Sequence, residues 1–266
     1  MYTIAIANFK GGTGKTATCH ALGVALATEH GRRVLLVDCD AQSGLTGACG
    51  VHDVSENTLA GVFDEPFSGA PALRRFMYSI IRQAQPGLDL LPADIGLARS
   101  EQRLLTRMRR EFVLRSALDT VASKYDVALL DCSPNLGALT TNALAAADAV
   151  LIPTIPNILD LRAVKLFLDA LQDFRTWLNP RLETMGILIT FLDSRATHHA
   201  SIIDVMRGLA VPVLDMTVGR SIRVAEASNE SKSIVDYEPR HAQAEAYRQL
   251  AAFVDEWISE RTKTPS

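Results

Sequence analysis

The sequence lacks cysteine pairs and long uninterrupted hydrophobic runs. Its four cysteines form no C-x-x-C pair, which argues against a zinc or iron–sulfur clip and fits buried, reduced thiols. The longest apolar stretch, residues 143–152, contains an aspartate and is much shorter than the ~20 residues of a membrane span. The amino-terminal residues lack a basic stretch, an apolar core and a cleavage site in series. We therefore expect no export signal and a cytoplasmic protein.

The sequence also lacks a strong charge imbalance and any linker-like segment. Its formal net charge of −3 gives no global attraction to a polyanion, so a nucleic-acid contact would need a local basic patch. No Gly/Ser/Pro-rich linker and no internal repeat divides the 266 residues, and the composition is that of an ordinary globular protein. We expect one domain over residues 1–260 and a frayed tail over residues 261–266.

Short β-branched apolar runs alternate with longer helical patterns along the chain. This alternation predicts an α/β fold, with a mostly parallel twisted sheet and helices on both faces. Strands are expected at residues 2–7, 33–38, 88–91, 127–131, 149–152, 185–190 and 213–216. Helices are expected at residues 15–29, 97–107, 112–123, 136–146, 160–177, 199–208 and 242–260. Residues 57–71 are rich in turn formers, which predicts a surface excursion.

A glycine-rich phosphate-binding motif lies between the first predicted strand and the first predicted helix. It reads Lys10-Gly-Gly-Thr-Gly-Lys15-Thr16. In such a loop the glycines let backbone N–H groups surround phosphate oxygens, and the following helix contributes its positive amino-terminal dipole. Lys15 is expected to reach the β- and γ-phosphates, and the Thr16 hydroxyl to bind Mg²⁺.

Acidic residues end two later strands of apolar sequence. Asp38 and Asp40 follow one strand, and a carboxylate there can hold or polarise the water that attacks a γ-phosphate. Asp131 ends another strand in Walker B form, where a carboxylate holds Mg²⁺ through its water shell. One such aspartate alone is better explained as a helix cap or turn residue, but three phosphate-site motifs in the correct order favour a nucleotide site.

The extra lysine at the front of the loop, Lys10, makes the sequence resemble the deviant Walker A group of P-loop NTPases, which includes ParA and MinD. The resemblance implies the cofactors ATP and Mg²⁺, a Lys10 that reaches the phosphates of a second subunit, and catalysis by Lys10, Lys15 and Asp40. It implies a metal site of Thr16, Asp40 and Asp131. The implied nucleotide-binding residues are Lys10, Gly11, Gly12, Thr13, Gly14, Lys15, Thr16, Ala17, Gly219 and Ser221.

The sequence is most similar to the ParA family of DNA-partitioning ATPases, from Tyr2 to about Phe253 and least over residues 51–88. Residues 42–50 resemble that family's switch loop, residues 140–153 its following helix and strand, and residues 220–228 and 236–247 its carboxy-terminal signature. Ala41 and Ser133 replace common prolines, and Thr13 replaces a common valine. Gly219 and Ser221 replace a proline and an asparagine that often contact the base.

Membership of this family would imply an ATP-dependent homodimer that binds double-stranded DNA without sequence specificity. A ParB-like adaptor would stimulate slow hydrolysis, and the ATP-bound form would associate with the nucleoid while it partitions a plasmid, a chromosome origin or a protein body. DNA contact is expected through phosphates and is therefore salt-sensitive. The residues in the matching segments are Arg195, Arg220, Arg223 and the nearby Lys232.

A second basic feature is independent of the resemblance. It comprises Arg99, Arg103, Arg107 and Arg110. Their spacing of four, four and three residues places them along one side of a helix, if the helix continues that far. This stripe could face DNA, the adaptor, or solvent with intrachain ion pairs.

Two rival functions follow from the same scaffold. A MinD-like ATPase would need an amphipathic carboxy-terminal membrane anchor, and Leu250, Phe253, Val254 and Trp257 do share one side of the last predicted helix. The acidic residues of that helix suit anionic lipid poorly, so we interpret it as packed on the sheet and expect no membrane binding. A metabolic ATPase such as a ligase is the other rival, whereas a cluster-transferring reductase lacks the necessary cysteine pair.

Overall fold

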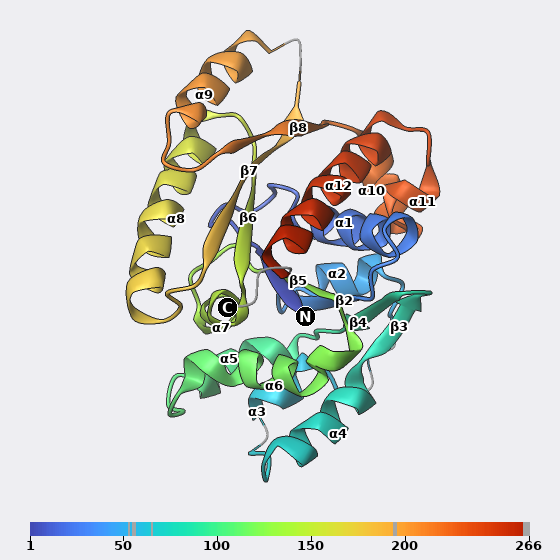
Figure 1. The fold of residues 1–266 in the computed structure, drawn as a ribbon, viewed down its shortest axis with the longest axis vertical. Coiled ribbons are helices and arrows are strands. Elements are labelled where there is room, and N and C mark those ends of the chain that lie inside the picture. Colours follow the sequence, from blue (N-terminus) through green and yellow to red (C-terminus); the bar gives the residue numbers. More distant parts are fainter. Residues whose placement is uncertain (53, 55–56, 65, 194–195, 263–266) are drawn as a thin grey trace.

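One sheet of parallel strands with a single antiparallel edge strand organises the molecule (Figure 1). The computed structural model describes residues 1–52, 54, 57–64, 66–193 and 196–262. Within these residues eight strands lie in the order β3-β4-β2-β5-β1-β6-β7-β8. The strands are β1 (Tyr2–Ile6), β2 (Val34–Cys39), β3 (Arg82–Gln85), β4 (Leu88–Leu91), β5 (Val127–Cys132), β6 (Ala149–Thr154), β7 (Glu183–Leu192) and β8 (Val213–Gly219).

Helices cover both faces of this sheet. They are α1 (Lys15–Glu29), α2 (Gly44–Ala48), α3 (Leu59–Asp64), α4 (Ala70–Ile80), α5 (Gly96–Leu104), α6 (Val113–Val121), α7 (Ala138–Ala146), α8 (Ile158–Trp177), α9 (Thr197–Arg207), α10 (Ile222–Asn229), α11 (Ile234–Tyr237) and α12 (Ala242–Thr262), with 3₁₀ turns η1 (Arg110–Phe112) and η2 (Ala122–Lys124). The predicted α/β class, the mostly parallel sheet and the two helical layers are confirmed.

Alternating side chains of the central strands divide the core into two layers. In β2, Val34 and Leu36 join the cluster under α1 and α12, while Leu35 and Val37 join the cluster under α6 and α7. Both sets are fully buried. Strands covered on both faces need apolar residues at every position, which explains the continuous apolar runs in the sequence.

The carboxy-terminal helix packs into the protein through its apolar side. Leu250 and Val254 of α12 are fully buried in the cluster beneath α1. The Arg261 guanidinium stacks over the Trp257 ring at 3.4 Å and pairs with Glu183 at 2.8 Å. The helix continues to Thr262, two residues past its predicted end, and residues 263–266 of the predicted tail lie outside the described residues. No helix in the described part of the chain is long and apolar enough to cross a membrane.

The interpretation of residues 57–71 as a surface excursion is wrong for residues 58–63, whereas residues 66 and 68–71 are exposed as expected. Leu59, Val62 and Phe63 of α3 are buried in the core, and α4 begins at Ala70. Turn-forming residues flank this short helix closely, so local composition hid it. The antiparallel edge strand β3, with the polar sequence RQAQ, was also not predicted.

The basic stripe is not one helical face. Its members are Arg99, Arg103, Arg107 and Arg110. Helix α5 ends at Leu104, and the chain turns before η1, so the predicted helix to residue 107 is too long. Arg103 pairs with Asp64 at 3.2 Å, Arg110 pairs with the adjacent glutamate at 3.0 Å, and Arg107 donates to a carbonyl of α3 at 3.0 Å. These contacts favour the interpretation as surface arginines with intrachain partners.

A glycine at the β6–β7 bulge provides a test of this packing. Gly186 has φ +153°, and a Cβ there would lie 2.8 Å from Leu214 Cδ2 and 3.0 Å from the Pro212 carbonyl oxygen. We expect Gly186→Ala to lower the free energy of unfolding by roughly 1–3 kcal/mol, because backbone strain and overpacking add. Urea denaturation measures this change.

The matched control is Gly47→Ala in α2. A Cβ at Gly47 meets no atom within 4 Å. Alanine is the better helix former, so this variant is expected to be as stable as the wild type or slightly more stable. Equal stability of the two variants would contradict the assignment of strain to Gly186.

Candidate nucleotide and metal site

The three sequence motifs meet at the carboxyl edge of the sheet. β5 lies between β1 and β2, with Ile6 and Asp38 each in register with Asp131. The phosphate loop leaves β1 at this edge and leads into α1. Carboxyl ends of parallel strands are where such folds place ligands. The predicted juxtaposition of the loop with the strand-end aspartates is therefore present.

The loop has the backbone geometry that its glycines permit. Gly12 and Gly14 adopt φ +75° and +83°, which L side chains rarely adopt. The Thr190 hydroxyl of β7 donates to the Thr13 carbonyl at 2.9 Å, and the Lys10 N–H donates to the Asn8 side-chain oxygen at 3.1 Å. These two hydrogen bonds hold the loop to the sheet from both sides.

The two lysines of the loop occupy different environments. Lys15 is 8% exposed, and its ammonium donates to the Lys10 carbonyl at 3.0 Å. Burial lowers the pKa of Lys15, and the nearby Asp131 opposes this shift. Lys10 is half-buried, and within the described residues its ammonium makes no hydrogen bond or ion pair. Lys15 thus points inward to the loop, and Lys10 retains an unused positive charge at its rim.

Asp131 is buried and only half satisfied. One oxygen accepts a 2.7 Å hydrogen bond from the Thr16 hydroxyl, and the other, Oδ1, is enclosed without a partner among the residues that the structure describes. Burial raises the pKa of the Asp131 carboxyl to about 8, with a further contribution from neighbouring Asp38. Burial likewise raises the pKa of Asp38, to about 6. Two neighbouring carboxyls with raised pKa values mark a place where a cation would be stabilised.

Asp38, to which we assigned no role of its own from the motif, holds α2 through Thr46. Its Oδ2 accepts from the Thr46 N–H at 2.9 Å and from the Thr46 hydroxyl at 2.7 Å. The same hydroxyl accepts from the Ala93 N–H at 3.0 Å. A fully buried network thereby joins β2, α2 and the end of β4.

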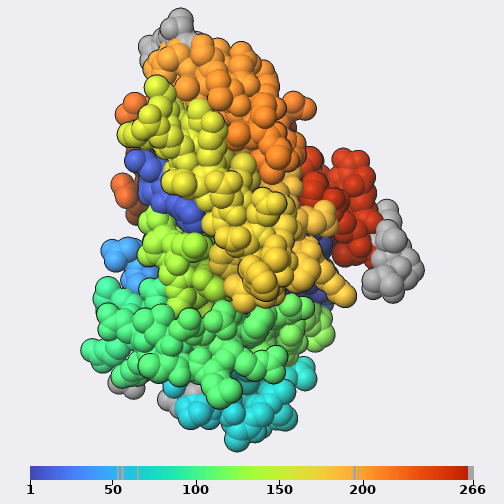
Figure 2. Space-filling view, turned by 90° about the vertical axis from the view of Figure 1, so that its left-hand side faces the viewer, coloured from blue at the N-terminus to red at the C-terminus, as the bar shows by residue number. Residues whose placement is uncertain are grey.

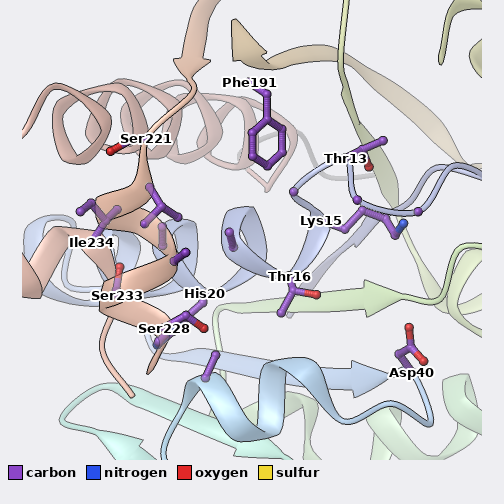
Figure 3. A pocket seen from close by; sticks show the side chains of 18 of the residues that line it. Thr13, Lys15, Thr16, His20, Asp40, Phe191, Ser221, Ser228, Ser233 and Ile234 are labelled. Atoms are coloured by element: carbon purple, nitrogen blue, oxygen red, sulfur yellow. The ribbon is translucent and has the colours of Figure 1, made fainter. Parts of the chain in front are cut away.

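Asp40 lies at the open end of the site. It is half-buried, and its Oδ1 accepts from the Gln42 N–H at 3.0 Å. Its own N–H donates to Asp38 at 3.2 Å, which fixes the direction in which the loop leaves the strand. Figure 3 shows Asp40, Lys15 and Thr16 at the same end of the pocket. This position suits a carboxylate that orients water toward a terminal phosphate.

The residues present fit Mg²⁺ held together with a phosphate. In the described residues no group of three or more His, Cys, Asp or Glu side chains could hold a metal ion alone. Mg²⁺ commonly keeps several waters and uses one or two protein ligands with substrate phosphates. Thr16 would supply the hydroxyl, and the orphaned Asp131 oxygen would accept from a coordinated water. No protein cage is required.

A cavity of about 430 Å³ extends from the phosphate loop along α1. Its lining comprises the loop from Gly11 to Ala17, Asp40, and side chains of α1, α10 and the segment before α11. Figure 3 shows Lys15 and Asp40 at one end, with His20, Ser228 and Ser233 toward the other. The cavity is therefore polar at the loop and mixed beyond it, as a nucleotide with a phosphate chain and a base requires.

Of the two residues expected to contact the base, Gly219 and Ser221, only one lines the cavity. Ser221 lines the cavity, whereas Gly219 lies outside its lining. The Gly219 N–H donates to the Gln243 side-chain oxygen at 2.6 Å. The Ser221 hydroxyl accepts from the Arg223 N–H at 3.1 Å and contacts His241 Nε2 at 3.3 Å. These polar groups are already used within the protein.

The four basic residues expected to contact DNA do not form one uniform patch. Arg195 lies outside the described residues. Arg220 is exposed, and Arg223 is exposed but paired with Glu226 at 2.7 Å. Lys232 lines the nucleotide cavity. The described residues thus place only Arg220 and Arg223 close together on the surface, at either end of the short turn into α10.

Sequence reasoning missed several residues of the site. Asn8, Thr46 and Thr190 hold the loops through side-chain hydrogen bonds, and His20 and Phe191 line the cavity. A polar residue within an apolar strand pattern was an available signal for Thr190. The i, i+3 spacing from Ala17 to His20 could have placed His20 on the same side of α1.

Comparison with known proteins agrees with this geometry. A family model described as an AAA domain matches residues 1–184. The chromosome partitioning protein ParA of Caulobacter vibrioides is 36% identical over 94% of this chain and 92% of its own length. The sporulation initiation inhibitor protein Soj of Bacillus subtilis is 36% identical, over 93% of this chain and 96% of its own.

A solved structure from Mycobacterium smegmatis has a closely similar fold. It is named cobyrinic acid a,c-diamide synthase and contains an ATP analogue and magnesium. It is 35% identical to this chain and superposes with a TM-score of 0.82, covering 98% of this chain and 97% of its own. Relatives of equal similarity thus bear names from two functional classes.

The buried carboxyl pair predicts a pH dependence of stability. Asp38 and Asp131 have folded-state pKa values of about 6 and about 8, above the ordinary aspartate value, so the folded state binds more protons than the unfolded state. Without nucleotide or Mg²⁺, the free energy of unfolding should fall between pH 6.5 and 8, by up to about 1 kcal/mol per pH unit. Urea denaturation at several pH values measures the slope.

Asp131→Asn is expected to remove most of this slope, because an amide does not titrate. Asp126→Asn is the control, since Arg33 lowers the pKa of that surface carboxyl and keeps its titration below the window. The window also avoids His20, whose pKa burial lowers to about 4. A slope that persists in Asp131→Asn would contradict the assignment.

Proposed function

Because the chain belongs to the ParA family of P-loop ATPases, we propose that it binds Mg²⁺-ATP and uses ATP binding and hydrolysis to switch between a DNA-bound dimer and a free monomer. The observation that supports this most is the site itself. A glycine-rich phosphate loop lies beside two buried strand-end aspartates, and the lysine ammonium at its rim has no partner among the described residues. Each step of the cycle uses residues of this edge.

In the nucleotide step, the loop N–H groups and Lys15 hold the phosphates. The Lys15 ammonium now donates to the Lys10 carbonyl, and a β- or γ-phosphate oxygen is a stronger acceptor for the same donor. Thr16 and Asp131 hold Mg²⁺ and its water shell. When bound, Mg²⁺ neutralises charge that develops on the phosphates. Asp40 orients the attacking water.

In the dimer step, Lys10 crosses to the phosphates held by a second copy. Its ammonium has no partner in the described part of the protein. At the same carboxyl edge of the sheet, Leu136 follows β5, and Ile158 and Leu159 follow β6; their side chains are 47%, 59% and 62% exposed. Exposed apolar side chains at the edge that carries this cation support a surface that is covered in another state.

In the DNA step, Arg220 and Arg223 contact backbone phosphates. Arg223 already pairs with Glu226 at 2.7 Å and lies 3.6 Å from Glu238, so DNA must compete with these carboxylates. Exposed pairs of this kind contribute little, so exchange for a phosphate is feasible. Binding of this type weakens steeply with salt. The ATP-bound dimer would then associate with the nucleoid.

In the release step, a ParB-like adaptor on the cargo stimulates hydrolysis and the dimer opens. Intrinsic hydrolysis should be slow, because a switch must hold its state. The relatives named for chromosome partitioning and sporulation support a role in positioning DNA. The cargo could be a plasmid, a chromosome origin or a protein body.

Two alternatives receive less support. A membrane-positioning ATPase would use the apolar side of α12, but Leu250 and Val254 are fully buried there. A ligase is suggested by the name of the similar M. smegmatis structure. That activity would give ATP turnover that depends on a small-molecule acceptor and is indifferent to DNA, so the DNA experiment below separates the two.

Substitutions in the phosphate loop separate binding, dimerisation and hydrolysis. Lys15→Ala should abolish ATP binding, whereas Lys10→Ala should retain ATP binding but stay monomeric, because the proposed contact of Lys10 with the phosphates of the second copy is lost. Asp40→Ala should form the ATP dimer and fail to hydrolyse ATP. Fluorescent nucleotide titration, light scattering and phosphate release measure the three properties. Normal dimerisation of Lys10→Ala with ATP would contradict the role of Lys10.

DNA binding should require ATP and the Arg220–Arg223 surface. We expect wild-type protein with ATP to retain an arbitrary duplex at low salt and to lose it with ADP or at moderate salt. Arg220→Ala/Arg223→Ala should weaken binding at least about tenfold, because two phosphate contacts are lost. Electrophoretic mobility shift assays measure both effects.

Arg181→Ala is the matched control. Arg181 is exposed and directly precedes β7, so it lies at the amino ends of the strands, whereas Arg220 follows the carboxyl end of β8. It should bind DNA as the wild type does. Intact ATP-dependent dimerisation without DNA binding in any nucleotide state would refute the DNA step and favour a ligase.

A further inference from the structure

His20 lies in the nucleotide cavity beyond the phosphate loop. It is five residues after Lys15 in α1, so it lies about 7.5 Å farther along the helix axis. Ala17, His20 and Ala21 share one side of the helix and line the cavity, and the two small alanines leave room beside the imidazole. Figure 3 shows His20 near Ser228, Ser233 and Ile234, away from Lys15 and Asp40. A nucleotide whose phosphates occupy the loop extends its nucleoside in this direction.

The imidazole of His20 is a buried polar group with no protein partner among the described residues. The residue is 7% exposed, and it lines the cavity. Burial lowers its pKa to about 4, so at neutral pH the ring is uncharged and offers one N–H donor and one acceptor. Buried polar groups in native proteins are nearly always hydrogen-bonded to protein, water or ligand. A group left unpaired in a ligand cavity is therefore suited to the ligand.

Several other polar groups near the base end are already engaged. The Gly219 N–H donates to Gln243, and Ser221 uses its hydroxyl on Arg223 and His241. Ser233 accepts from the N–H of Val235 at the start of α11. Ser228 and Lys232 also line the cavity, but both side chains are exposed. Among the described residues at this end, His20 is the buried one whose donor and acceptor are both unused.

We propose that His20 hydrogen-bonds the base of the bound nucleotide and supplies base recognition that Gly219 and Ser221 do not. This inference rests on the proposed nucleotide binding and adds a specificity residue to it. The contact is made by one ring nitrogen to a polar atom on the edge of the base. The second ring nitrogen remains for water, and the alanines beside the imidazole contact the flat face of the base.

The test compares ligands that share the phosphates but differ in the base. ATP, GTP and ribose 5′-triphosphate, which has no base, are titrated with Mg²⁺ at pH 7.5 into wild type, His20→Leu and His20→Gln by calorimetry. We expect His20→Leu to bind ATP about three- to tenfold more weakly, the range for one lost hydrogen bond. Its affinity for ribose 5′-triphosphate should equal that of the wild type. His20→Gln should recover part of the ATP affinity, and the ATP-to-GTP ratio shows which base the contact favours.

His30→Leu is the control, because His30 is the residue after the last turn of the same helix and lies outside the cavity. It should bind all three ligands as the wild type does. If His20→Leu is folded and keeps the wild-type ratio of ATP to ribose 5′-triphosphate affinities, or weakens both ligands equally, His20 does not read the base. Failure of the wild type to bind any triphosphate would instead refute the proposed nucleotide function.

Discussion

The site depends on two buried carboxyl groups, Asp38 and Asp131, held side by side in the register of β2 and β5. Each has a raised pKa, so placing both there costs free energy in the absence of a cation. Lys15 lies close enough to favour the ionised form of Asp131, but burial lowers its own pKa. The folded protein thus holds two carboxyl groups whose ionisation is unfavourable at this edge of the sheet, and bound Mg²⁺ with a nucleotide would favour their ionised form. Groups with shifted pKa values commonly cluster at ligand-binding sites in this way.

The same carboxyl pair connects the phosphate site to the rest of the molecule. Asp131 accepts from Thr16 at the start of α1, while Asp38 accepts from Thr46 in α2. Thr46 in turn accepts from the Ala93 N–H, and the next carbonyl back along the chain, that of Pro92, accepts from the N–H at the start of α3. A change in the charge next to Asp131 therefore acts on hydrogen bonds that lead to both helical layers. A nucleotide-dependent switch requires such a contiguous network physically.

Most long periodic segments and the strand-to-loop motifs could be predicted from the sequence because their signals are local; the eleven-residue helix α4 is the exception and was missed. Helix α1 has its predicted bounds, and β4 does too, since flanking glycines and apolar runs define both. The short helices α2, α3, α10 and α11 could not be predicted in this way. They are four to eight residues long, too short for a helical period, and tertiary contacts such as Thr46 on Asp38 stabilise them. The end of α5 at Leu104 was missed, because the regular spacing of arginines continues past the point where the helix ends.

The phosphate end of the candidate site could likewise be predicted from the sequence, whereas its base end could not. Lys15, Thr16, Asp40 and Asp131 were predicted because phosphate chemistry requires their types at fixed places after strands, and the fold brings them to one edge. The base end could not be predicted, since a base is recognised by whichever polar groups remain unused after folding. The hydrogen bonds of Gly219 and Ser221 are internal, which leaves the neutral imidazole of His20 facing the cavity. The residues for phosphate binding can therefore be predicted from a local sequence motif. The residues for base binding can be identified only once the folded structure shows which polar groups are already hydrogen-bonded.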